Sequence, residues 1–256
     1  MNVIDNVISY AGHAGDTEAF EAEYRNILDK YGFVHAVDLP DSFDHASFLA
    51  RFGAFYPGPS GKLIDDIVPE TGMDDVYYGS NKRSLLPHTE GYEFPGLPPR
   101  YLALWCVTPP TGAGGETTLF DARPVTDRMS AAARSHLEES RFDWVASEGL
   151  RRIGLGQRAT HPMLETVEGI ELLRFSCNNL VLKQPDEVVA SFRAQIMREW
   201  DGGHHRVSYV RNDLVQFDNW RVLHSRNAFS DPKRHLKRIQ IRHRTDLRSC
   251  PAPAQG

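Results

Sequence analysis

Two histidines and one glutamate in this sequence have the residue types and the spacing of a metal site. His88 and Glu90 stand two positions apart, and on an extended backbone side chains at that spacing point to the same face. A further imidazole, His224, stands far downstream. Two imidazoles and one carboxylate that leave coordination positions open are the ligand set of non-heme Fe(II) oxygenases. A His-x-Glu pair alone occurs often by chance, so other features must support this prediction.

Sequence context separates these two histidines from the other members of a set of eleven. His88 directly precedes a long hydrophobic segment, and His224 follows the turn Asp218-Asn219 at the start of an apolar segment. By contrast, His204-His205 follow a pair of glycines, which predicts an exposed loop. His45 falls in a helical context and is expected to face solvent.

A basic segment near the C-terminus is the third feature that could do chemistry. Read as a strand, residues 233–242 put Arg238, Gln240 and Arg242 on one face. A charged stripe of this kind is most often a solvated face. The alternative is that Arg238 points into a barrel, where it could form a bidentate pair with a dicarboxylate cosubstrate. Thr117, on another predicted strand, could add a hydroxyl donor to the same carboxylate.

The elements that must position these residues follow from hydrophobic periodicity and from turn signals. Helices are predicted over residues 17–31, from Ser42 or Asp44 to Phe52, over 124–137 and over 185–200. Strands are predicted over residues 33–39, 101–107, 116–121, 142–145, 171–175, 207–210, 214–217 and 236–243. Thr17 is the candidate N-cap of the first helix, and Gly202-Gly203 should end the last. About eight short strands, with helices at the N-terminus and in an insertion, predict a mainly β fold with a jelly-roll barrel of cupin type.

The stretch from Tyr56 to Pro87 is rich in proline and glycine and reads as loops with one short strand. Loops at the mouth of a rigid scaffold often carry substrate contacts. Every candidate substrate residue is equally well interpreted as an ordinary surface or packing residue. The candidates are Tyr77, Tyr78, Asn81, Arg83, Arg174, Asn178, Asn179 and Arg226.

Length and composition limit the class of protein. The chain has 256 residues, 41% hydrophobic and 25% charged, which fits one globular domain over residues 1–256. A formal net charge of −5 gives no reason to expect nucleic-acid binding, and no apolar run is long enough to span a membrane. Three widely spaced cysteines predict neither a disulfide framework nor a zinc site. We expect a cytoplasmic protein without a signal peptide, with a disordered tail over residues 249–256.

Four short motifs in register resemble the taurine dioxygenase (TauD/TfdA) family of Fe(II)/2-oxoglutarate oxygenases. They are His88-Thr89-Glu90, Gly114-Gly115-Glu116-Thr117, Asp218-Asn219 with His224, and Arg234 to Arg238. The resemblance covers about residues 30 to 245 and implies a double-stranded β-helix core with an N-terminal helical cap and a helical insertion.

The resemblance also implies roles for individual residues. His88, Glu90 and His224 would ligate Fe(II). Arg238, with Thr117, would hold the distal carboxylate of 2-oxoglutarate, and Arg234 would lie near its keto-acid end.

Glu90 stands where taurine dioxygenase itself has aspartate. The glutamate resembles the branch that contains clavaminate synthase and amino-acid hydroxylases of peptide-antibiotic pathways. Related halogenases lack this carboxylate, because chloride takes its coordination position, so Glu90 favours hydroxylation over chlorination.

The resulting expectation is an enzyme that uses Fe(II), 2-oxoglutarate and O2 to hydroxylate an aliphatic C–H bond of an amino acid or a derivative. The substrate could be free or tethered to a carrier protein, in specialised metabolism such as antibiotic biosynthesis. Desaturation or cyclisation by the same cofactor chemistry is one alternative. A cupin-like protein that binds metal or a small acid without oxidative turnover is another.

Overall fold

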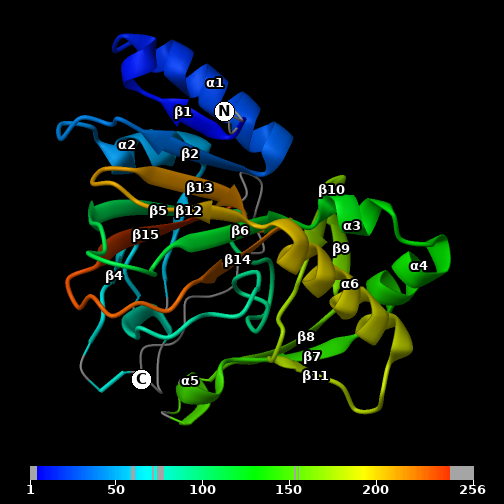
Figure 1. Ribbon diagram of the computed structural model, residues 1–256. Helices are drawn as coiled ribbons and strands as arrows, with labels where there is room; N and C mark the ends of the chain where they lie inside the picture. The colour runs from blue at the N-terminus through cyan, green and yellow to red at the C-terminus, as the bar shows by residue number, and fades with distance from the viewer. Residues whose placement is uncertain are drawn as a thin grey trace.

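The computed structural model describes residues 5–58, 61–70, 72–73, 78–152, 154 and 156–242. Within these ranges the chain is mostly sheet with several helices (Figure 1). The expected tail over residues 249–256 and the last residue of the expected strand, His243, lie outside the described residues.

A mostly antiparallel seven-stranded sheet forms the larger part of the core. Six of its strands follow one another in space in the order β1 (Val7–Ser9), β2 (Phe33–Val37), β13 (Leu214–Asp218), β5 (Tyr101–Thr108), β15 (His235–Ile241) and β3 (Phe55–Tyr56). The seventh, β4 (Asp65–Ile67), pairs with β15. Only the β1–β2 pairing is parallel among the described pairs of this sheet.

A smaller sheet carries His224, the second of the two candidate histidine ligands. It consists of β12 (His205–Val207), β6 (Thr117–Asp121) and β14 (Val222–Arg226), all antiparallel. Apolar side chains from both sheets meet in one buried cluster, which includes Leu119 and Val222 from the small sheet and Leu102, Val215 and Leu236 from the large one. Full burial of such a side chain contributes about 1.5–3 kcal/mol, so this cluster holds the two sheets together.

Two helices cover the outer face of the large sheet (Figure 1). They are α1 (Thr17–Tyr31) and α2 (His45–Leu49), which is followed by the 3-10 turn η2 (Ala50–Phe52). A second 3-10 turn, η1 (Ala11–His13), precedes α1. The helix bounds agree with the sequence prediction, but the N-cap of α1 is Asp16, whose carboxylate accepts from the backbone N–H groups of Glu18 and Ala19.

Residues 123–203 form a separate region with its own buried cluster around Trp144, Phe175 and Ile196, on the right of Figure 1. Its helices are α3 (Arg123–Asp127), α4 (Ala131–Glu139), α5 (Glu148–Arg152) and α6 (Glu187–Gly203). Its strands are β7 (Phe142–Val145), β8 (Arg158–His161), β9 (Leu164–Val167), β10 (Ile170–Leu173) and β11 (Leu180–Val181).

Several local predictions were wrong. The single helix expected over 124–137 is divided into α3 and α4, because the Ser130 hydroxyl accepts from Ala133 N–H and starts a new helix. The helix expected over 185–200 runs from Glu187 to Gly203, and it ends at the glycines as predicted but includes them. His45 is buried rather than solvent-facing, stacked on Trp105 at 5.1 Å between ring centroids. His205, expected in an exposed loop, begins β12 and pairs with Leu119.

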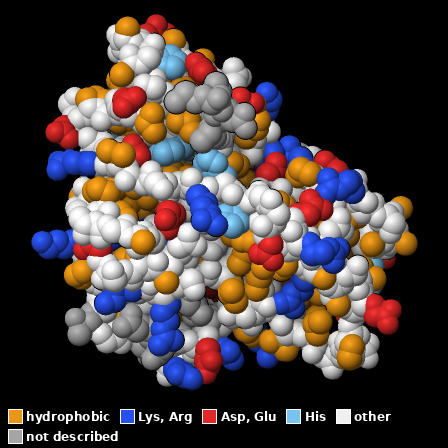
Figure 2. Space-filling view, in the orientation of Figure 1, with side chains coloured by type: hydrophobic (Ala, Val, Ile, Leu, Met, Phe, Trp, Pro, Cys, Tyr) orange, Lys and Arg blue, Asp and Glu red, His pale blue; other side chains and the backbone are white. Residues whose placement is uncertain are grey.

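The surface is consistent with the modest net charge. Figure 2 shows basic and acidic side chains interspersed over the visible face of the described chain. In the same described part, no helix is both long enough and apolar enough to cross a membrane.

Candidate metal centre and its cavity

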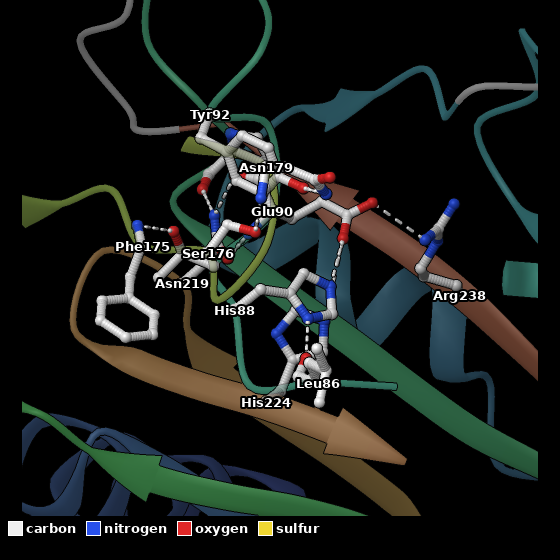
Figure 3. A network of polar contacts seen from close by, with 12 residues as sticks. Leu86, His88, Glu90, Tyr92, Phe175, Ser176, Asn179, Asn219, His224 and Arg238 are labelled. Carbon is white, nitrogen blue, oxygen red and sulfur yellow. Dashed lines mark hydrogen bonds and ion pairs between the residues drawn. The ribbon is translucent and has the colours of Figure 1, made fainter. Parts of the chain in front are cut away.

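His88, Glu90 and His224 converge on one point, as their spacing predicted (Figure 3). One ligand atom from each lies within 4.8 Å of the other two. Glu90 Oε2 is 3.5 Å from His88 Nε2 and 3.8 Å from His224 Nε2. Two imidazoles and one carboxylate on one side of a point are the donors that suit a divalent iron ion with open positions.

Backbone pairing brings the two histidines together. His88 and His224 form an isolated antiparallel bridge, in which His88 N–H donates to His224 O (3.1 Å) and His224 N–H donates to His88 O (2.9 Å). The two imidazole rings consequently lie on the same side, with centroids 4.2 Å apart. β14 therefore fixes His224, and through this bridge it also fixes the loop that carries His88.

The hydrogen bonds of the rings show which nitrogen faces the site. His88 Nδ1 lies 2.8 Å from Leu86 O, and because a carbonyl only accepts, Nδ1 must carry the proton. In the neutral ring, Nε2 would then have its lone pair toward Glu90, as a metal ligand requires. His224 Nδ1 has no hydrogen-bond partner among the described residues, and its ring packs on Phe217 at 4.9 Å.

Glu90 is held by its backbone as well as by its carboxylate. The fully buried Asn219 accepts from Glu90 N–H (2.7 Å) and donates to Glu90 O (3.0 Å) and Pro99 O (3.0 Å). Burial disfavours the charged carboxylate, but Arg238 and the two nearby imidazoles outweigh burial and hold the pKa of Glu90 well below its usual range. Glu90 is therefore ionised and ready to bind a cation.

Arg238 lies beside the metal ligands. Its guanidinium is 3.2 Å from Glu90 Oε1 and 3.2 Å from Asp65 Oδ2 on β4. The β15–β4 pairing sets this contact directly, because Arg238 and Asp65 are register partners.

Thr117 contacts Tyr209 and shares the cavity wall with both Arg234 and Arg238. Tyr209 O–H donates to Thr117 Oγ1 at 2.8 Å. Burial raises the pKa of Tyr209, and the nearby charge of Arg234 opposes that shift. Arg234 Nε donates to Gly115 O at 3.1 Å. A Cβ on Gly115 would lie 3.1 Å from the Arg234 side chain, so glycine at this position leaves room for the guanidinium.

The Arg234 guanidinium has an unused hydrogen-bond donor. It is 1% exposed, and its Nη1 has no hydrogen-bond partner among the described residues. Burial lowers the pKa of Arg234, yet guanidinium stays charged at neutral pH. A buried cation with an unused donor is a site for an anion, and a carboxylate is the geometric match.

One cavity of about 370 Å³ joins the metal ligands, Thr117, Arg234 and Arg238. Its wall is largely apolar, with Phe217, Leu102 and Leu236 among the lining residues. A largely apolar cavity with a few convergent polar groups is the usual form of a small-molecule site.

The expected substrate residues have different places in the structure. Arg226, Asn178 and Asn179 line the cavity. Asn81 is buried behind Arg226 and accepts from Arg226 Nη2 at 2.7 Å. Outside the cavity wall, Arg174 pairs with Glu165. Tyr77 lies outside the described residues, and Tyr78 is described by its backbone alone, in the 3-10 turn η3 (Tyr78–Ser80).

Glu93 is a cavity residue that the sequence analysis missed. It lines the cavity, and its Oε2 is buried without a hydrogen-bond partner among the described residues. Burial and the neighbouring charge of Glu90 raise the pKa of Glu93 to about 7. It stands three residues after Glu90 in a segment rich in glycine and proline, where no periodicity distinguishes it.

Known proteins share both the sequence pattern and the fold. Residues 9–240 match the family model described as taurine catabolism dioxygenase TauD, TfdA family. The chain is 25% identical over 229 residues to tyrosine isonitrile desaturase of Pseudomonas aeruginosa, covering 81% of this chain and 77% of that protein. It is 24% identical to human gamma-butyrobetaine dioxygenase over 253 residues, covering 91% of this chain and 61% of that protein.

A solved structure of asparagine oxygenase in complex with Fe(II), 2S,3S-3-hydroxyasparagine and succinate has a similar fold. The TM-score is 0.69 at 19% identity, covering 90% of this chain and 81% of the other. The match of the family model over most of the chain confirms the resemblance inferred from the four motifs. The chain belongs to the TauD/TfdA family of dioxygenases.

Proposed function

We propose that this protein is an Fe(II)- and 2-oxoglutarate-dependent oxygenase that hydroxylates an aliphatic C–H bond of an amino acid or amino-acid derivative. The observation that carries the proposal is one cavity that holds both a two-histidine, one-carboxylate cluster and a buried arginine with an unused donor. The family membership and the Fe(II) and succinate in the asparagine oxygenase structure support the choice of metal and cosubstrate.

The donor atoms of the three candidate ligands fit Fe(II). His88 Nε2, His224 Nε2 and Glu90 would hold Fe(II), since their donor atoms already converge. When bound together, Fe(II), 2-oxoglutarate and O2 supply the oxidation of an unactivated C–H bond, with succinate and carbon dioxide as coproducts. The apolar lining excludes water from the centre, as such chemistry requires.

For the cosubstrate we propose the reverse of the arginine roles expected from sequence. Arg234 Nη1 and Thr117 would receive the distal carboxylate, because this Nη1 is an unused donor and Arg234 lies near Tyr209, the hydrogen-bond partner of Thr117. Tyr209 donates to Thr117 Oγ1, which leaves the threonine O–H free to donate to that carboxylate. Arg238 would act beside the metal, where it neutralises Glu90 and supports its charged form.

Substrate contacts are proposed on the polar part of the cavity wall. Arg226 and Asn178 line the cavity with groups that can bind a carboxylate or an amide. The double-stranded β-helix core, with its helical cap and insertion, would hold this wall rigid. Desaturation is a second candidate outcome, favoured by the similarity to tyrosine isonitrile desaturase.

The test is succinate formation and oxygen consumption by the purified protein with Fe(II), 2-oxoglutarate and a panel of free amino acids. We expect one or a few members to stimulate turnover and to give products heavier by one oxygen. A product lighter by two hydrogens would select desaturation instead. Binding of metal and 2-oxoglutarate with no oxygen consumption would select the non-oxidative binding protein.

A variant pair tests the metal ligands. His88→Ala should abolish iron-dependent turnover, whereas His13→Ala, remote in sequence and bonded to Glu23, should retain it. Full activity of His88→Ala would refute the ligand assignment.

A further inference from the structure

The Glu93 carboxylate is unusual among the charged groups of the cavity. Glu90 has Arg238 as its partner, and Arg238 also contacts Asp65. Glu93 forms no ion pair with any described residue, and its Oε2 is buried against the cavity without a hydrogen bond. An ionised carboxylate in this state lacks a donor, and a protonated one lacks an acceptor at the same oxygen. Neither protonation state is satisfied by the protein alone.

A second role as a metal ligand does not account for Glu93. The group of His, Asp, Glu and Cys side chains whose ligand atoms lie within 4.8 Å contains His88, Glu90 and His224 but not Glu93. This statement covers the described part of the chain. The missing partner of Glu93 is therefore not a metal held by these three side chains, and a substrate in the cavity is the group that can supply it.

We propose that Glu93 is a substrate-binding residue that receives a positively charged amine of the substrate. This inference rests on the proposed function and narrows its substrate class to molecules with a free ammonium group near the oxidised carbon. An ammonium ion supplies both the N–H donor and the positive charge that the carboxylate lacks. A neutral amide would supply only the donor and would leave a buried negative charge without compensation.

The position of Glu93 suits this role. It follows the ligand Glu90 by three residues, and three extended residues span at most about 11 Å. Both carboxylates line the same cavity, so an amine held by Glu93 lies in the space that the candidate metal ligands face. The same carboxylate rejects substrates that present an anion there, because two buried like charges repel.

The experiment compares free amines with blocked or missing ones on wild type, Glu93→Gln and Glu93→Asp. The probes are the protein amino acids, their N-acetyl forms, and the pair lysine and norleucine, which differ by one side-chain amine. Binding is measured by calorimetry without oxygen on the Fe(II)- and 2-oxoglutarate-loaded protein, and coupled succinate formation is measured in air. Glu139→Gln, the same change on an exposed residue of α4, is the matched control.

We expect wild type to bind at least one free amine and to lose that binding when the amine is blocked or absent. Glu93→Gln should weaken binding of the free amine roughly 10- to 100-fold, as expected for a lost charge-assisted hydrogen bond. Its KM should rise more than its kcat falls, Glu93→Asp should lie between, and Glu139→Gln should match wild type.

The proposal is overturned if wild type binds no free amine of the panel, or binds free and blocked forms equally. It is also overturned if Glu93→Gln binds the amine as wild type does. A different result would refute the proposed function alone: wild type would bind an amine through Glu93 but would consume neither oxygen nor 2-oxoglutarate.

Discussion

Asn219 provides a direct test of how the metal ligand Glu90 is positioned. Its side chain is fully buried and forms three hydrogen bonds, two with the backbone of Glu90 and one with Pro99 O. Asn219→Leu keeps the approximate volume but removes all three. It leaves a buried N–H and two carbonyl oxygens without this partner, and each such loss costs about 1–3 kcal/mol.

The expected loss of stability is about 3–5 kcal/mol, below the simple sum because the freed loop can relax toward water. Fe(II) affinity should also fall about 10- to 100-fold, as is typical when a group that orients a ligand is removed. Urea unfolding of the metal-free protein measures the first effect, and anaerobic calorimetric titration with Fe(II) measures the second.

Asn227→Leu is the matched control. Asn227 is half-buried, and its side-chain amide donates to Glu116 Oε2 at 3.1 Å. Its substitution should cost no more than about 1.5 kcal/mol and leave Fe(II) affinity unchanged. If Asn219→Leu were as stable as this control and bound Fe(II) equally well, Asn219 would not be the residue that positions Glu90.

Two further predictions concern the cavity. Tyr209→Phe removes the O–H that occupies a lone pair of Thr117, so the threonine proton is no longer directed to the cosubstrate. The KM for 2-oxoglutarate should rise about 5-fold, which corresponds to roughly 1 kcal/mol, with little change in kcat. An unchanged KM would refute this role of Tyr209. In the metal-free protein, Glu93 has a folded-state pKa of about 7, raised from 4.5 by burial and by Glu90. Between pH 4.5 and 7, Glu93 has lost its proton in the unfolded chain but still holds it in the folded protein. The free energy of unfolding should therefore fall by up to about 3 kcal/mol as pH rises through this range. Urea unfolding of Glu93→Gln should lack this contribution, and identical pH slopes for both proteins would contradict it.

The cluster of His88, Glu90 and His224 could be predicted from sequence, because a metal site needs particular residue types. His88 and Glu90 at strand spacing, with a distant His224 at the start of an apolar strand, leave few other partners for a three-residue site. The bounds of the first helix could be predicted, because its apolar positions and its glycine end are local signals, but its N-cap is Asp16 and not the expected Thr17.

The arginine roles could not be derived from local sequence. Arg234 and Arg238 are four residues apart, and strand periodicity does not tell which of them lies nearer the metal. That choice is made by long-range pairing, which sets Arg238 opposite Asp65 and leaves Arg234 beside Gly115. Glu93 was missed for a related reason, since its loop has no periodic pattern and only the folded cavity gives it significance.

The backbone bridge between His88 and His224 has a consequence for folding. Both histidines depend on the same two hydrogen bonds, and those bonds join segments far apart in the chain. Such distant contacts form slowly, because a long loop must close before they contribute. Iron bound across the bridge would then act after the main folding barrier and would mainly slow unfolding. The metal would therefore stabilise the folded protein after its strands have paired, and it would not nucleate folding.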